Sequence, residues 1–545
     1  MSRPAAVLLA LGLLASSCTV DGARGPTEIG APGTPLTRST RPPCRNLDEL
    51  VARVKRGYVP RKGTQITFIP REPNYIGTAE RPVHSGPWDY LAHVPLVLYG
   101  PGIVKPSLKV NQHATMADLA PTTAELIGFD DFPTRDGRVL TRPFEPDAPR
   151  PRLVVSLVWD GGGWNVLNAH KGSWPYYKSL MEQGVLYDNF DIGSSPSVTP
   201  PVHTTLGTGA WPFHHGVHSL RVRTRDEYLE SFYRLDPSII QIPTLADLYD
   251  RALDNRPVTG MIATLNWHLG MIGHGLATPG GDADPALLLR KDGSIFGNAD
   301  LFDVPSDYED AALLEAFERQ VDRADGEADG KWRGSTLEGS ESKDWTPATV
   351  AYQQRLIERF VTDRDMGADA EPDLLYVNFK ASDSAGHVFG MTSREVSDII
   401  EAQDAALKRL VRFLNRRVGS GRWVLMVTAD HGQTPYPEQS GAWPIAGGEL
   451  GADANAALDQ RDNAVDLVDR VSAVGAYINM RELRANRLSL PKVARWFAGY
   501  TVAENLKDGE KMPSRFTNRE DEPLFDAIVA RRDFVAVACR RQQNS

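Results

Sequence analysis

Three apolar segments of the chain are each followed by acidic residues or histidines. Asp160 follows the first segment, Asp383 and His387 follow the second, and Asp430 and His431 follow the third. Carboxylates and imidazoles together are the donor set of zinc and of other borderline divalent ions. A single Asp after a strand is usually a turn or cap residue. Three such segment ends, two of them with an Asp–His pair, instead predict a metal centre.

Thr199 is the candidate nucleophile. It lies in the segment 194–203, where the sequence changes from a loop to a helix, and Pro200 and Pro201 follow it. Thr is favoured as an N-cap and Pro in the first helical turn, so a capped helix with no further role is one interpretation. A helix N-terminus also attracts phosphate, and a hydroxyl there that binds a metal can lose its proton and attack phosphorus. This segment alone leaves both interpretations open.

These residues need a parallel sheet to bring them together. The segments 153–159, 374–379 and 423–428 are continuous apolar runs, typical of strands buried on both faces. Helices are expected over residues 176–183, 350–362 and 396–415. In an open parallel sheet, ligands bind beyond the carboxyl ends of the strands. The pattern therefore predicts an α/β fold in which the three segment ends meet at one site.

The rest of the chain divides by composition. Before residue 153 we expect a strand over 94–99, a helix over 116–127 and a Pro-rich linker over 141–152. The regions at about 220–345 and 434–535 carry no clear periodicity, and within the first of them residues 285–345 are acidic and Gly-rich. We expect these two regions to be insertions that form a cap.

The N-terminus has the features of an export signal. Arg3 precedes a short apolar run, and small residues lead to Cys18, so residues 1–18 predict a signal peptide of the lipoprotein type. The polar segment 19–43 predicts a flexible tether. We expect the protein to be secreted and lipid-anchored at the outer face of the cell membrane, with ordinary secretion as the alternative. In an oxidising compartment Cys44 and Cys539 could form a disulfide, and two free thiols are the alternative.

The overall charge limits the class of partner. The 545 residues carry a formal net charge of -10, which argues against a basic groove for specific nucleic-acid binding. It does not exclude a nucleotide as a small substrate. The oligomeric state stays open.

Four spaced motifs resemble those of the alkaline phosphatase superfamily, and most closely its type I phosphodiesterase and nucleotide pyrophosphatase-like branch. They are WDGGG at 159–163, PSVTPPVHTTLGTGAWPFHHGV at 196–217, ASDSAGHVFG at 381–390 and TADHGQ at 428–433. The resemblance implies an alkaline phosphatase-like α/β/α sandwich with a mostly parallel central sheet. It also implies a two-metal phosphoesterase for phosphodiesters, nucleotide pyrophosphates or phosphomonoesters.

The same resemblance implies the site residues. One divalent ion, most simply Zn²⁺, would be held by Asp160, Thr199, Asp430 and His431. A second would be held by Asp383, His387 and one further histidine. Thr199 would attack phosphorus and carry the phosphate as a covalent phosphothreonine, and small phosphate esters or nucleotides would be the substrates.

The further histidine implies a circular permutation. In the family it lies C-terminal to the Asp–His motif, but no histidine follows His431 here. The family's C-terminal block is similar to HSGPWDYLAHVPLVLYGPGI at 84–103, which is followed by DLAPTTAELIGF and DGRVL. His84 would then complete the second metal site. In the permuted order, residues 44–140 are the C-terminal part of the catalytic domain, 141–152 link the old ends, and 153–540 are its main part.

Other activities and a non-enzymatic role are the alternatives. A sulfatase of the superfamily needs a Cys/Ser-x-Pro-x-Arg segment, which the residues from Thr199 to His203 do not match. A phosphonate-hydrolysing member would use a similar site. A non-catalytic, metal-binding surface lipoprotein is the non-enzymatic alternative, and the complete ligand set argues against it.

Overall fold

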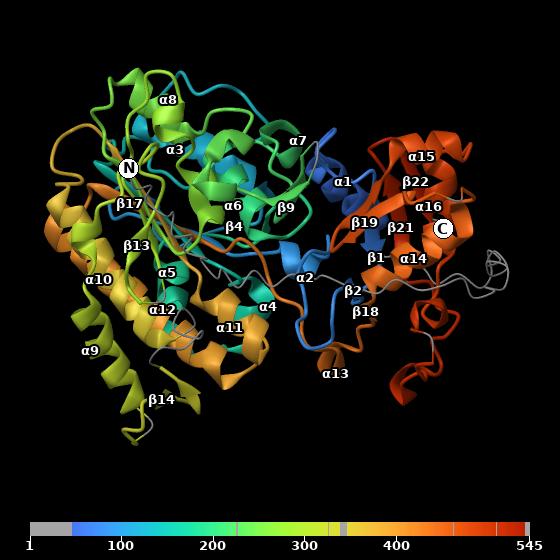
Figure 1. Cartoon of the computed structure of the whole chain (residues 1–545). Coiled ribbons are helices and arrows are strands. Elements are labelled where there is room, and N and C mark those ends of the chain that lie inside the picture. The colour runs from blue at the N-terminus through green and yellow to red at the C-terminus, as the bar shows by residue number, and fades with distance from the viewer. Residues whose placement is uncertain are drawn as a thin grey trace, which may run out of the picture.

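The computed structural model describes residues 46–224, 227–290, 292–324, 326–337, 346–461, 463–507 and 509–539. The predicted signal peptide and tether, together with Cys18 and Cys44, lie outside these residues. The described chain forms two bodies side by side (Figure 1). One is a sandwich around a nine-stranded sheet, and the other is a smaller lobe around a five-stranded sheet.

The nine-stranded sheet brings the three predicted strands to its middle. Its order is β13 (Ile295–Phe296), β12 (Ala286–Leu289), β11 (Thr259–Ala263), β16 (Asp373–Phe379), β6 (Leu153–Trp159), β17 (Trp423–Thr428), β3 (Leu96–Tyr99), β7 (Val185–Tyr187) and β4 (Leu108–Val110). From β12 to β17 the strands pair in parallel, and β3 is antiparallel to both of its neighbours. The carboxyl ends of β16, β6 and β17 therefore lie together at one edge of the sheet.

Helices cover both faces of this sheet, because its central strands are buried on both sides. Leu157 of β6 belongs to the core on one face, and the next residue, Val158, belongs to the core on the other. One core includes residues of α4 (Trp164–Ala169), α5 (Pro175–Gln183), α10 (Pro347–Asp363) and α12 (Arg394–Leu414). The opposite core includes residues of α3 (Leu119–Ile127), α6 (Thr199–Thr208) and α8 (Leu245–Ala252). The predicted α/β/α sandwich with a mostly parallel sheet is confirmed.

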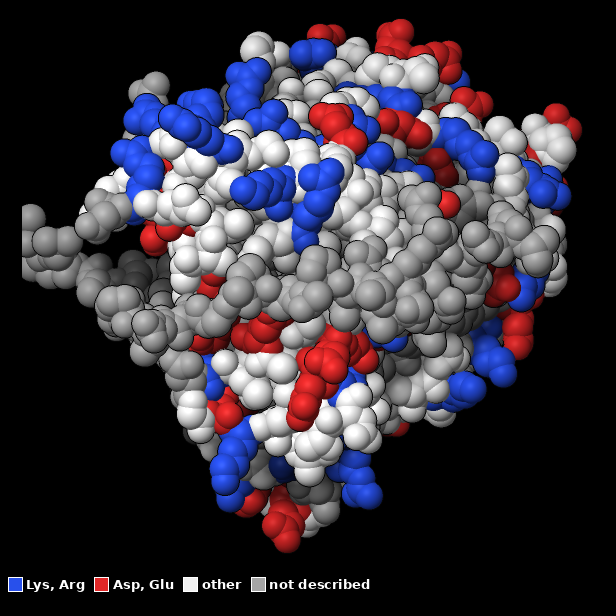
Figure 2. Space-filling view, turned by 90° about the vertical axis from the view of Figure 1, so that its right-hand side faces the viewer, with Lys and Arg blue, Asp and Glu red and all other residues white. Residues whose placement is uncertain are grey.

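The smaller lobe has an antiparallel sheet. Its strands, in order, are β19 (Val468–Ser472), β20 (Gly475–Ile478), β1 (Ile66–Pro70), β21 (Phe525–Ala530) and β22 (Phe534–Val537). On one side the core includes residues of α14 (Gly447–Leu458), α15 (Met480–Ala485) and α16 (Leu490–Gly499), and on the other it includes residues of α1 (Leu47–Gly57). Both basic and acidic side chains are spread over the face that carries this lobe (Figure 2).

Two segments of the chain are placed differently in the structure than the sequence predicted. The region 220–345, predicted as an insertion, supplies β11, β12 and β13 to the main sheet. Their short apolar runs are separated by polar loops, which hid the strand pattern. The segment 44–140 also divides, because α1 and β1 join the smaller lobe while β3, β4 and α3 join the sandwich. The region 434–535 forms most of that lobe.

Three further features concern the linker, the cysteines and the length of the helices. The linker 141–152 contains no helix or strand and leads directly into β6. Cys539 is disulfide-bonded, but both other cysteines lie outside the described residues, so its pairing with Cys44 stays a prediction. Among the described residues, no helix combines the length and the apolar character that a membrane span requires.

Candidate active site

The edge where β6, β16 and β17 end gathers the predicted ligands. Asp160 follows β6, Asp430 and His431 follow β17 after Ala429, and α11 (Ala381–Phe389) follows β16. Asp383 lies in the first turn of α11 and His387 in its last turn. This i, i+4 spacing places both side chains on one face of the helix.

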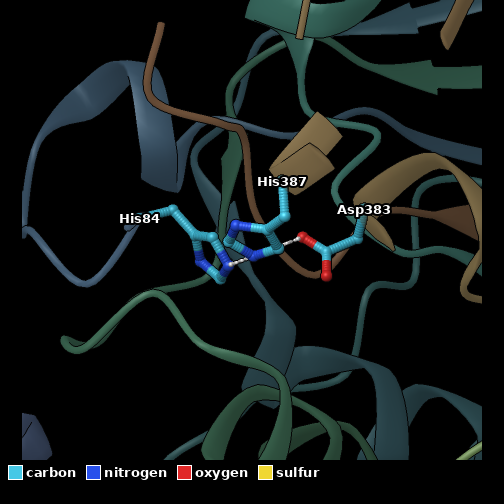
Figure 3. Close-up of side chains that lie close together, drawn as sticks. All are labelled: His84, Asp383 and His387. Carbon is cyan, nitrogen blue, oxygen red and sulfur yellow. Dashed lines mark hydrogen bonds and ion pairs between the residues drawn. The ribbon is translucent and has the colours of Figure 1, made fainter. Parts of the chain in front are cut away.

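His84 joins Asp383 and His387 from the N-terminal part of the chain. The Nε2 atoms of His84 and His387 are 3.1 Å apart, and each lies 3.5 Å from Oδ1 of Asp383. Figure 3 shows the two rings turned toward each other beside the carboxylate, from separate parts of the ribbon. Ligand atoms that share a tetrahedral zinc at about 2.0–2.1 Å are about 3.3 Å apart, so this spacing suits one ion.

Backbone carbonyls fix the orientation of the three histidines. Nδ1 of His84 donates to the carbonyl of Ser197 at 2.6 Å, Nδ1 of His387 to that of Pro82 at 3.2 Å, and Nδ1 of His431 to that of Gly432 at 3.0 Å. Since the carbonyls can only accept, each Nδ1 carries a proton, and each ring turns its Nε2 atom to the site. Donation of the second ring N–H to a carbonyl or carboxylate is usual for a metal-binding histidine.

Asp160, Asp430 and His431 form the neighbouring cluster. His431 Nε2 lies 3.2 Å from Oδ2 of Asp430 and 3.6 Å from Oδ1 of Asp160. His431 Nε2 and Asp430 Oδ2 are buried and have no hydrogen-bond partner among the described residues, and the same is true of Oδ1 of Asp383. Buried polar atoms without partners are costly. Their convergence indicates that divalent ions fit this site.

Thr199 reaches these carboxylates through Lys380. Thr199 is the first residue of α6, and Val198, not Thr199, is the N-cap. Lys380 Nζ donates to Thr199 Oγ1 at 3.0 Å and to Asp160 at 2.8 Å, and it lies 2.7 Å from Asp383. Because lysine is rarely buried, the sequence alone predicts a surface position for Lys380. Its side chain is only 5% exposed, so that prediction is wrong. Its ammonium links the candidate nucleophile to one carboxylate of each cluster.

Three further polar residues surround Asp160. Asn378, in β16, donates to Oδ2 of Asp160 at 3.0 Å, and His268 Nε2 lies 3.3 Å from the same oxygen. Asn378 Nδ2 is also 2.9 Å from His203 Nε2, and His203 Nδ1 donates to the carbonyl of Thr199. His203 thus links Asn378 to the backbone of the candidate nucleophile by hydrogen bonds. His268 follows β11, and the rule used for the other strand ends would have found it if β11 had been recognised.

Burial and neighbouring charges set the protonation states of the side chains in the site. Burial alone would raise the pKa of Asp160, but Lys380 and the nearby histidines together outweigh burial and hold that pKa well below the ordinary value. Burial, followed by the neighbouring His431, lowers the pKa of His84 well below its usual range. Burial also lowers the pKa of His387. Both rings are therefore neutral near pH 7, the form that binds metal.

His431 behaves in the opposite way. Burial would lower its pKa, but Asp430 outweighs burial and raises the pKa to about 9. With that pKa the ring is protonated near pH 7, and an ion that binds Nε2 would displace the proton.

Comparison with known proteins identifies the class of enzyme. The family model for type I phosphodiesterase / nucleotide pyrophosphatase matches residues 154–522, more than half of the chain. The chain belongs to this family. It is accordingly a phosphoric ester hydrolase of the alkaline phosphatase superfamily.

Two relatives and one solved structure are similar to the chain. Alkaline phosphatase PafA of Elizabethkingia meningoseptica is 24% identical over 402 residues, which cover 63% of this chain and 72% of PafA. Alkaline phosphatase PhoV of Synechococcus elongatus is 21% identical over 355 residues. The match covers 56% of this chain and 63% of PhoV, which is less than two thirds of its length. The crystal structure of wild-type PafA has a TM-score of 0.55 at 18% identity and covers 68% of this chain and 82% of PafA. The structural likeness concerns the fold.

Proposed function

We propose that the protein is an exported, two-metal phosphatase that hydrolyses phosphate monoesters through a covalent intermediate on Thr199. The observation that carries this proposal is the buried hydrogen bond from Lys380 to Thr199 Oγ1, beside two clusters of metal-type ligands. Both curated relatives described above are alkaline phosphatases, which favours monoesters over diesters as the substrate class.

The first ligand set is assigned by proximity and the second by the resemblance to the family motifs. Asp383, His387 and His84 would hold one ion, since their ligand atoms lie within 4.8 Å of one another. Asp160, Asp430 and His431, with Thr199, would hold the other. The donor set of carboxylate oxygens and imidazole nitrogens suits Zn²⁺. When bound, the two ions would neutralise charge on the reacting oxygens of the phosphate ester.

The residues of the chain itself position and activate the nucleophile. Lys380 donates to Thr199 Oγ1, so its ammonium stabilises the negative charge that develops when the hydroxyl loses its proton. The oxygen then attacks phosphorus, the ester bond to the leaving alcohol breaks, and phosphothreonine forms. The leaving oxygen takes a proton from water, which replaces the proton that the threonine hydroxyl lost to solvent. Water cleaves the new phosphorus–oxygen bond and releases phosphate. Pro200 and Pro201 have no backbone N–H to offer to the phosphate, which leaves this task to side chains and ions.

A circular permutation would account for the order of the parts. The family match begins at residue 154, so His84 lies outside it. Yet His84 lies beside Asp383 and His387, and β3 pairs with β17 in the central sheet. A family C-terminus moved to the front of the chain would give this arrangement. Termini that lie close together at the surface make such a rearrangement physically acceptable.

Export and membrane attachment are part of the proposal. The signal-like residues 1–18 and the position of Cys18 support a lipid anchor on the outer face of the membrane. The disulfide-bonded state of Cys539 supports an oxidising compartment. We propose Cys44 as its partner, which would tie down the segment at the start of α1.

Rates on matched substrates test the proposed function. The purified full chain should release phosphate from an aryl phosphate monoester faster than it cleaves the corresponding diester. A chelator should abolish the reaction, and added Zn²⁺ should restore it. Mass spectrometry of acid-quenched enzyme should find phosphate on Thr199. Equal rates with and without chelator, or faster cleavage of the diester, would contradict the proposal.

A further inference from the structure

A second group of carboxylates lies at the opposite edge of the central sheet. Asp250 is in the last turn of α8, and Asp282 and Asp284 lie in the loop before β12. Each offers a ligand atom within 4.8 Å of the others. Asp250 accepts a hydrogen bond at 3.0 Å from Thr259, the first residue of β11. The catalytic ligands follow the last residues of the parallel strands, so this group lies at the other end of the sheet.

One carboxylate oxygen of this group is buried without a partner. Oδ1 of Asp250 accepts from Thr259, but Oδ2 has no hydrogen-bond partner among the described residues. The side chain of Asp250 is only 3% exposed. A buried carboxylate oxygen beside two other carboxylates is costly unless a cation or a proton compensates it.

Among the described residues, the charges that act most strongly on this group are those of other aspartates. Asp247, one turn earlier on α8, is itself bound to His274 at 2.8 Å. Burial, and then the nearby Asp282 and Asp247, raises the pKa of Asp250 to about 7, although its bond to Thr259 acts in the other direction. Asp284 is 5% exposed, and burial followed by Asp250 raises its pKa well above the ordinary value. The neighbouring charges that raise these pKa values are other aspartates.

We propose that Asp250, Asp282 and Asp284 bind a calcium ion that stabilises the β11–β12 edge of the sheet. The donors are all oxygens, which suits a hard cation and not zinc. Oxygens opposite each other across a Ca²⁺ at about 2.4 Å are about 4.8 Å apart, so the group is compact enough for one such ion. Asp282 is partly exposed and leaves a route from solvent. The ion would cross-link the end of α8 to the loop that leads into β12.

Thermal unfolding of the full chain tests this site. After chelation, millimolar Ca²⁺ added to the wild type should raise the Tm by about 2–5 °C. The Asp282→Asn/Asp284→Asn variant should lose this rise. Without calcium the variant should be more stable than the wild type, because the buried like charges are gone. Asp383→Asn, altered in the catalytic site, should keep the calcium response.

Several outcomes would overturn the proposal. The wild type could show no response to Ca²⁺, or the double variant could keep the full response. If Asp250 and Asp284 instead share a proton, the Tm should rise as the pH falls from 8 to 6, and added Ca²⁺ should not change it. Terbium(III) luminescence of the wild type, competed by Ca²⁺, gives a second measurement that does not need a folded variant. Its failure to compete would also refute the site. The proposed phosphatase activity does not depend on any of these results.

Discussion

The two edges of the central sheet carry carboxylate groups that are compensated in different ways. At the carboxyl edge, Lys380 lies within 2.8 Å of both Asp160 and Asp383, and three neutral or protonated histidines face them. At the amino edge, Asp250 and Asp284 are similarly buried but are flanked by other aspartates. The first edge offers mixed nitrogen and oxygen donors, and the second offers oxygen only. The same sheet can therefore support chemistry at one end and structural cation binding at the other.

This difference follows from the direction of the strands. Loops that leave the carboxyl ends of β6, β16 and β17 converge, so residues distant in sequence meet there. The amino edge is reached by loops that enter strands, and Thr259 opens β11 beside Asp250. Substitutions at the first edge should change turnover, whereas those at the second should change stability.

The largest effect should come from Thr199→Ala. Removing the attacking oxygen should lower kcat for an aryl phosphate at least about 10³-fold, while bound metal stays close to the wild-type amount. Thr199→Ser keeps the hydroxyl and is the matched control, with a smaller loss. Metal content would be measured by elemental analysis of the same samples. Near-normal turnover in the alanine variant would mean that the nucleophile is elsewhere.

Lys380→Met should produce the next largest loss. Without the ammonium, the Thr199 oxygen loses its hydrogen-bond donor, and kcat should fall about 10²–10³-fold. Lys380→Arg should recover part of the rate, since it keeps the positive charge. Lys178→Met, at an exposed position of α5, is the control and should leave kcat unchanged. If Lys380→Met keeps full activity, the lysine only compensates the charges of Asp160 and Asp383 and does not assist the nucleophile.

His84→Ala should have a smaller effect that metal can partly reverse. One of three ligands is lost, so the metal affinity should fall at least about tenfold, and activity should fall with it. Excess Zn²⁺ should recover part of the rate because Asp383 and His387 remain. His93→Ala, whose ring contacts the carbonyl of Asp188, is the control from the same segment. Unchanged zinc content in His84→Ala would refute the proposed role and weaken the permutation.

The smallest effect concerns pH and the Asp247–His274 pair near the amino edge. Burial would lower the pKa of His274, but its bond to Asp247 outweighs burial and raises it above 6.5. Burial would raise the pKa of Asp247, but His274 outweighs burial and lowers it below 3.8. The pair's stabilisation is therefore complete between pH 3.8 and 6.5 and is lost as the pH rises through the pKa of folded His274. It is also lost as the pH falls through the pKa of folded Asp247.

Chemical denaturation at several pH values checks this pair. Between about pH 4 and 6.5, His274→Asn should be less stable than the wild type by about 1–2 kcal/mol. The difference should shrink at pH 8 and above. A difference that stays constant across this range would show that His274 contributes by packing and not by its charge.

The sequence by itself predicted which residues gather at the carboxyl edge of the central sheet. Short continuous apolar runs are typical of strands buried on both faces, and the acidic residues and histidines that follow parallel strands lie at one sheet edge. Residues 153–159 and 423–428 form β6 and β17 with the predicted bounds, and Thr199 begins α6. Local pattern is sufficient here because burial on both faces leaves little alternative to a central strand.

Only the tertiary structure decided which distant residues join these strands. Lys380 lies one residue after β16 and its sequence suits a surface position, but the fold buries it between Asp160 and Asp383. His268 and Asp250 are linked to strands β11 and β12, which polar loops concealed. The contact of His84 with His387 spans 303 residues. Such contacts depend on how the strands are ordered in the sheet, and that order is set by packing across the whole core, not by the pattern of any one segment.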